Sequence, residues 1–173
     1  VLGLVESAVG VVPSGGGVKE SYLRWYQQTG SWDEAAWKCW MNIGYGATGS
    51  SPELSARLQY FRPNHDETIM NRDRLLPRAI ELIGELGVNY RPPQPLTARL
   101  ASAALSDKMT DFMQAGVDKG DFMPHDKTTA MAIASIMVQS AGDAADVDED
   151  TLYARERAAF ISLAKTAPTH QRI

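Results

Sequence analysis

The segment LVESAVGVVPSGGGVKES, residues 4–21, contains residues whose types and spacing could support chemistry. Glu6 lies in an apolar run, and Pro13 and three consecutive glycines, Gly15–Gly17, follow it. Apolar surroundings disfavour an ionised carboxylate and raise its pKa, so such a group can act as an acid or base near neutral pH. Glu6 could equally be an exposed carboxylate or one paired with a basic side chain, because most acidic residues are exposed.

The glycine cluster could cradle a phosphate or could form a tight turn. A phosphate-binding Walker loop places its lysine directly after the last glycine and a serine or threonine after that. Here Val18 separates Gly17 from Lys19, and Glu20 follows, which excludes a Walker loop. Glycine tolerates backbone angles that other residues avoid, so we expect a tight strand-to-helix turn in which Gly15–Gly17 shape the wall of a pocket.

Other residues that could bind metals or act as nucleophiles show no suitable pattern. The three histidines lie near turns or the terminus without metal-ligand spacing, so we expect no metal site. Cys39 has no neighbouring histidine or cysteine and is expected to be a small buried residue. The histidines are His65, His125 and His170.

The elements that must position these residues are mainly helices. Residues 1–12 read as a strand, and a helical pattern begins at Val18 and breaks near Thr29 and Gly30. A second helix is predicted to be capped by Ser31 or Asp33, and a flexible stretch over 44–51 follows it. A short helix is predicted from Pro52 and a brief strand over 59–63. The next predicted helix is capped by Asn71 and ends at Gly84 and Gly87.

A proline-rich segment, residues 91–96, divides the predicted organisation. Its prolines forbid a helix, so we expect residues 1–90 and 97–173 to be separate units joined by a linker. The second unit is predicted to contain no strand and three antiparallel helices, over about 97–117, 124–141 and 148–165. The chain is therefore expected to be mostly α-helical with a few short strands.

Composition limits the classes of partner. The 173 residues are 44% hydrophobic and 22% charged, as in ordinary globular proteins, and a net charge of −4 gives no reason to expect nucleic acid. No apolar stretch is long enough to span a bilayer, no signal peptide is recognisable, and a single cysteine suits the cytoplasm. Because the chain starts without methionine inside an apparent strand, we expect it to be a fragment of a longer protein.

The spacing of Glu6, Gly10, Pro13 and Gly15–Gly17 resembles the crotonase (enoyl-CoA hydratase/isomerase) superfamily. The likeness continues through LQYFRPNHDETIMNRDRLL, YRPPQP and DTLYARERAAFISL, and this set is similar to bacterial 3-hydroxyacyl-CoA dehydrogenases that carry a crotonase-like domain. The resemblance implies an α/β crotonase fold whose trailing part spans residues 1–90, followed by a three-helix extension. It also implies a role in fatty-acid β-oxidation.

The resemblance implies roles for the residues of the first segment. Glu6 would be catalytic and exchange the proton at the α-carbon of an acyl-CoA substrate, while Pro13 and Gly15–Gly17 would contribute to substrate binding. A second carboxylate, the thioester oxyanion hole and an NAD-binding domain would come from the rest of the polypeptide. The isolated chain is therefore expected to bind no cofactor and to be inactive, and a homo-oligomer is possible in this family.

For each of three further features, the sequence leaves two interpretations open. Trp37 and Trp40 share a helix face and are expected to be a core or interface stripe, or else to line an acyl-chain pocket. The arginines at 72, 74 and 78 are expected to form a solvated, salt-bridged helix face, or else to contact a CoA phosphate. The chain as a whole could instead be a non-catalytic helical module that docks onto the dehydrogenase part.

Overall fold

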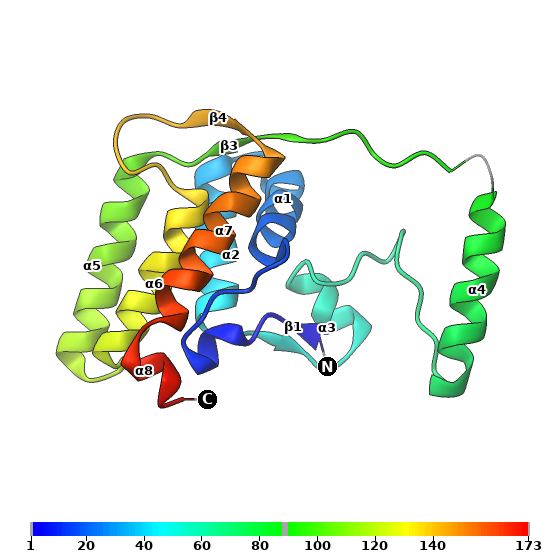
Figure 1. The fold of residues 1–173 in the computed structure, drawn as a ribbon, viewed down its shortest axis with the longest axis horizontal. Coiled ribbons are helices and arrows are strands. Elements are labelled where there is room, and N and C mark those ends of the chain that lie inside the picture. Colours follow the sequence, from blue (N-terminus) through cyan, green and yellow to red (C-terminus); the bar gives the residue numbers. More distant parts are fainter. Residues whose placement is uncertain (1, 88–89, 173) are drawn as a thin grey trace.

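The computed structural model describes residues 2–87 and 90–172, most of which are helical. Most helices gather in one body, and one helix stands apart from it at the end of extended segments (Figure 1). The long helices are α1 (Gly17–Thr29), α2 (Trp32–Gly44), α4 (Leu75–Leu86), α5 (Ala103–Lys119), α6 (Pro124–Met137) and α7 (Glu149–Ala164). The short ones are η1 (Glu6–Val9), α3 (Pro52–Arg57), η2 (Arg72–Arg74) and α8 (Ala167–His170).

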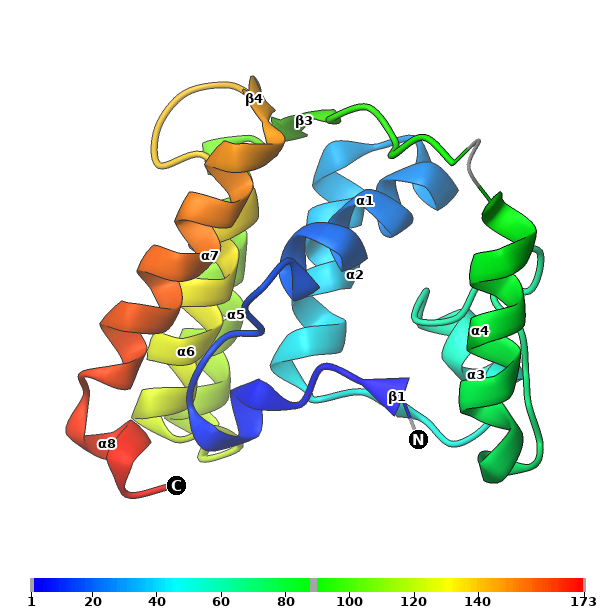
Figure 2. The same ribbon diagram turned by 45° about the vertical axis from the view of Figure 1, so that its right-hand side comes forward.

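The hydrophobic core of the body lies between α1 and α2 on one side and α5, α6 and α7 on the other (Figure 2). Apolar residues recur on one face of α2, where Cys39, Trp40 and Ile43 are buried. Trp40 packs against Trp37 and Phe112, and its indole nitrogen donates to the Ala130 carbonyl at 2.8 Å. The predicted core position of Cys39 is confirmed, and the tryptophan pair is part of this core.

The core therefore crosses the proline-rich segment in sequence. Residues before it, such as Val18 and Ile43, belong to the same buried cluster as Ile133 and Leu163 after it. Residues 91–96 themselves carry no helix or strand. The division into units 1–90 and 97–173 stays a prediction, and so does the assignment of the first unit to the α/β crotonase class.

Helix ends follow local capping chemistry. The Ser31 side chain accepts a hydrogen bond from the Glu34 amide, and Asn71 does the same for Asp73 at the start of η2. Pro52 occupies the first turn of α3, where its missing N–H is not needed. Gly30 ends α1 with a φ of 69°, which glycine adopts without strain. These predicted helix starts and stops are confirmed.

Several predicted boundaries are wrong. Of residues 2–12, only Leu2–Gly3 form a strand, β1. Glu6–Val9 make a 3₁₀ turn that Gly10 ends with a φ of 80°. Residues 59–63 form no strand, Gly84 lies inside α4, and α6 ends at Met137 instead of residue 141. β1 pairs antiparallel with β2 (Thr48–Gly49), inside the stretch predicted to be flexible.

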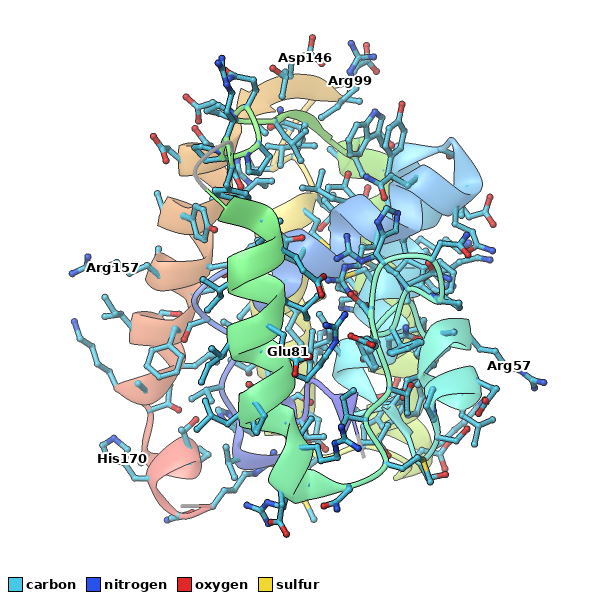
Figure 3. The ribbon with its side chains drawn as sticks, turned by 90° about the vertical axis from the view of Figure 1, so that its right-hand side faces the viewer. Arg57, Glu81, Arg99, Asp146, Arg157 and His170 are labelled. Atoms are coloured by element: carbon cyan, nitrogen blue, oxygen red, sulfur yellow. The ribbon has the colours of Figure 1, made fainter. Side chains whose placement is uncertain are left out.

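The prediction of no strand after the linker is also wrong. β3 (Thr97–Leu100) pairs antiparallel with β4 (Ala145–Asp148), and α5 begins only at Ala103. β3 alternates exposed and buried residues, as a half-buried strand does, and places Ala98 and Leu100 over Leu23 and Leu152. Arg99 reaches across to Asp146 at 2.7 Å on the exposed side, as Figure 3 shows.

α4 has an apolar face that no part of the described chain covers. Every apolar side chain on it is exposed, with Leu76 and Ile83 each at 70% and Ile80 at 62%. On its polar side, Arg78 bonds to Glu67, Glu81 and Glu85, which fits the predicted salt-bridged face for this arginine. Within residues 2–87 and 90–172, no helix, α4 included, is long and apolar enough to cross a membrane.

Candidate active site

A groove of about 370 Å³ lies beside the glycine loop. Its walls come from three segments that are distant in sequence: the end of β1, the start of α1 and the chain after α3. Gly15–Gly17 all line it, together with Gly3, Arg24 and Tyr60. The structure thus brings the predicted glycines to a hollow surface, and the substrate-binding role assigned to them stays a prediction.

The glycines are required by the shape of the turn into α1. Gly15 and Gly16 have φ values of 73° and 99°, a region that L-residues with side chains rarely adopt. A β-carbon at Gly16 would lie 3.1 Å from the Tyr153 ring, and one at Gly17 would lie 2.8 Å from Pro13. Pro13 is buried beneath the turn and packs against Gly17, so it supports the groove wall from behind.

Glu6 does not lie in the strand predicted over residues 1–12; it begins η1 and is half-buried. Its Oε2 atom is buried and has no hydrogen-bond partner among the described residues. Tyr60, which lines the groove, is close enough to respond to this carboxylate: burial raises the pKa of Tyr60 to about 12, and the negative charge of Glu6 contributes. Glu6 itself is not among the residues that line the groove.

The first turn of α1 is capped by a buried glutamate from another helix. Glu156 on α7 is 1% exposed and accepts hydrogen bonds from the Gly16 amide at 2.7 Å and the Lys19 amide at 2.6 Å. These amides are the donors that an anion would need at this helix start. Because the Glu156 carboxylate occupies them, these two amides are not available to a phosphate.

Lys19 completes this buried polar cluster. Its ammonium group is 2% exposed, bonds to Glu149, pairs with Glu20 at 2.7 Å and lies 4.8 Å from the centre of the Tyr153 ring. Burial alone would lower the pKa of Lys19, but the bonds to Glu149 and Glu20 outweigh it and raise the pKa. Burial raises the pKa of Glu156, although both amide donors and Lys19 oppose this.

The helical spacing of apolar residues in α7 could have identified Glu156 from the sequence. Buried residues of α7 fall at Leu152, Glu156, Ala159 and Leu163, the spacing of one helix face. A charged residue on an otherwise apolar stripe indicates a buried charge that needs partners. The stripe identifies Glu156 but cannot identify Gly16 and Lys19, which lie about 140 residues earlier in the chain.

The described residues hold no group of three or more histidine, cysteine, aspartate or glutamate side chains that could bind a metal ion. His125 contacts Thr169 at 3.0 Å, and His170 contacts the Ala164 carbonyl at 2.6 Å. Cys39 is fully buried, and burial raises the pKa of its thiol to about 12, which leaves it protonated at neutral pH. Cys39 is therefore no nucleophile in the folded chain.

Comparison with known proteins gives one distant relative. The chain is 27% identical over 174 aligned residues to a Bacillus subtilis protein named probable 3-hydroxyacyl-CoA dehydrogenase. The match covers 99% of this chain but only 22% of that protein, so the chain spans about a fifth of its relative's length. No protein-family profile matches the chain, and no solved structure matches it either.

Proposed function

We propose that this chain is part of a 3-hydroxyacyl-CoA dehydrogenase-type enzyme and supplies a hydratase/isomerase-like site for acyl-CoA thioesters. The similarity over nearly the whole chain supports the first half of the proposal. The second half rests on the buried, unpartnered Oε2 of Glu6, two residues beyond Leu4, which lines the glycine-walled groove. A buried acceptor without a donor costs about 1–3 kcal/mol, so such groups are retained mainly where a function or an outside partner compensates.

In the proposed reaction, water adds to a 2-enoyl thioester. One O–H bond of water breaks, its oxygen bonds to the β-carbon, and a proton is delivered to the α-carbon. Glu6 is proposed to hold the proton exchanged at the α-carbon, and a second carboxylate from polypeptide outside this chain would activate the water. The product is a 3-hydroxyacyl thioester, the substrate class in the relative's name.

The chain's own residues contribute one part of this site. Negative charge develops on the thioester oxygen during the reaction and needs fixed N–H donors close by. At the start of α1 the Gly16 and Lys19 amides are already bonded to Glu156, so they do not fit this role. We therefore propose that the isolated 173 residues are inactive and that the oxyanion donors lie elsewhere.

The same observation bears on NAD, which a dehydrogenase of this kind would use. A dinucleotide needs free helix N-terminal amides for its pyrophosphate, and those beside the glycine loop are bonded to Glu156. The described residues do not fit NAD at this loop. In the proposal, the cofactor binds another part of the enzyme.

Hydration of crotonyl-CoA by the longest natural polypeptide that contains this chain tests the proposal. Glu6→Gln keeps the size of the side chain but removes its basicity, and kcat should fall about 10²–10⁴-fold. Glu53→Gln, at an exposed carboxylate on α3, is the matched control and should leave kcat unchanged. Equal rates for the two variants would show that Glu6 is not the acid–base group.

A second candidate function is that of a docking module, and α4 is the observation that favours it. We propose that the rest of the polypeptide covers its exposed apolar face, since the relative is several times longer than this chain. Replacing Ile80 and Ile83 with glutamate should destabilise the longer polypeptide and leave the isolated chain within about 0.5 kcal/mol. Glu85→Gln, on the polar face, should change neither.

A further inference from the structure

A second cavity lies against η1, where Ser7 and Ala8 line it. It has a volume of about 300 Å³, and its other lining residues come from α2 and the residues after it, α5, the turn before α6, α6 and the C-terminal segment. It shares no residue with the glycine groove. Neither the similarity to the Bacillus protein nor the proposed chemistry of Glu6 assigns it a role.

Aromatic rings from separate elements line this cavity in a connected series. The Trp40 ring lies 5.8 Å from that of Phe112, the Phe112 ring 6.1 Å from that of Phe122, and the Phe122 ring 6.0 Å from that of Tyr45. Methionines 41 and 113 add polarisable sulfur, which contacts aromatic rings favourably. Such walls fit a flat aromatic molecule at the small end of the ligand-pocket range.

The charges of the lining balance internally. Asp126 and Arg172 are its ionisable side chains with opposite charge, and they form an ion pair at 2.7 Å. The second carboxylate oxygen of Asp126 accepts from the Met123 amide at 2.8 Å, so both its oxygens are occupied. A charged ligand would have to compete with this pair while losing its hydration, which favours a neutral ligand.

Besides the phenol of Tyr45, the lining has two hydroxyl groups whose protons are donated to backbone carbonyls. Ser7 donates its proton to the Ile43 carbonyl at 2.6 Å, and Thr129 donates to the His125 carbonyl at 3.1 Å. Each oxygen therefore has only acceptor capacity left, which suits a ligand that carries a donor. We infer that this cavity binds a small neutral aromatic molecule with a hydroxyl group.

Gly44 offers a way to block the cavity without disturbing the fold. It lies in the lining at the last residue of α2, its φ is not positive, and a β-carbon there would meet no atom within 4 Å. Gly84 in α4 has the same open surroundings and lies far from the cavity, so it is the matched control. Both positions are helical, and replacing glycine there should not reduce stability.

The test is ¹⁹F NMR titration of the 173-residue chain with 4-fluorobenzyl alcohol, which is neutral, and 4-fluorobenzoate, which is an anion without a donor. We expect the alcohol to bind with a dissociation constant below about 1 mM and the benzoate at least tenfold more weakly. Gly44→Phe should weaken alcohol binding at least tenfold, and Gly84→Phe should leave it unchanged. Ala8→Phe, on the opposite wall, is a second blocking variant in case Gly44→Phe does not fold.

Three results would overturn the inference: no binding of the alcohol, equal binding of the benzoate, or equal alcohol binding by the blocking and control variants. None of them depends on hydration of crotonyl-CoA. Loss of hydration in Glu6→Gln with no alcohol binding would retain the proposed function and reject the cavity. Alcohol binding together with full hydration activity of Glu6→Gln would support the cavity and reject the proposed role of Glu6.

Discussion

The Glu156 cap on α1 gives a prediction whose magnitude follows from the contacts. Glu156→Gln keeps one carbonyl oxygen for one of the two amides, Gly16 or Lys19, and turns an NH₂ group toward the other. A hydrogen bond to a charged group contributes about 1.5–3 kcal/mol, and a stranded buried donor costs about 1–3 kcal/mol. Since burial raises the pKa of Glu156, removing its charge recovers part of this loss. We expect a net destabilisation of about 2–4 kcal/mol.

Urea unfolding followed by far-ultraviolet circular dichroism measures this loss. For a chain of 173 residues, about 2–4 kcal/mol corresponds to a fall in Tm of roughly 5–15 °C. Glu149→Gln is the control: its amide oxygen can still accept from Lys19, which also keeps its pair with Glu20, so it should cost less than Glu156→Gln. A loss below about 1 kcal/mol for Glu156→Gln, or equal losses in both variants, would refute the capping role.

Three further predictions concern the same region and the core. Gly16→Ala should destabilise the chain by about 1–3 kcal/mol in urea unfolding, and more than Gly15→Ala, because only at Gly16 would the new β-carbon meet a neighbour. Cys39 should resist iodoacetamide until the chain unfolds, as judged by mass spectrometry; rapid labelling of folded chain would contradict its burial and raised thiol pKa. Because the pKa of Lys19 is raised in the folded chain, its ion pairs contribute stability that is complete below about pH 10.4 and is lost as the pH rises through the folded-state pKa. Glu149→Gln should therefore unfold at a lower alkaline pH than the natural chain. Unchanged alkaline unfolding would contradict the ion pair.

Local chemistry made part of this fold predictable. Ser31, Pro52 and Asn71 start helices through bonds or angles set within four residues, and Gly30 stops one by its own backbone freedom. The burial of Cys39 followed from its place between Trp37 and Trp40 in the sequence. Such features depend on the nearest turn of chain, and a sequence displays them directly.

The structural features that the sequence could not predict depend on partner residues far along the chain. Thr97–Leu100 is a strand because Ala145–Asp148 lies beside it, and the acidic second segment gives no sign of strand on its own. The glycine loop was predicted as a tight turn, but its cap comes from Glu156, far along the chain. For the candidate site, the sequence placed Glu6 near the glycines, whereas its position in a 3₁₀ turn, outside the lining of the groove, required the three-dimensional arrangement.

Exchange of the α-proton of butyryl-CoA in D₂O tests the assigned role of Glu6 most directly. A saturated thioester cannot be hydrated, so deuterium uptake at its α-carbon, measured by mass spectrometry, isolates the proton transfer proposed for this carboxylate. With the longest natural polypeptide that contains the chain, we predict uptake by the natural protein and by Glu53→Gln, and at least a 100-fold slower rate for Glu6→Gln, in line with the usual size of acid–base effects. Uptake by Glu6→Gln at the natural rate would contradict the account.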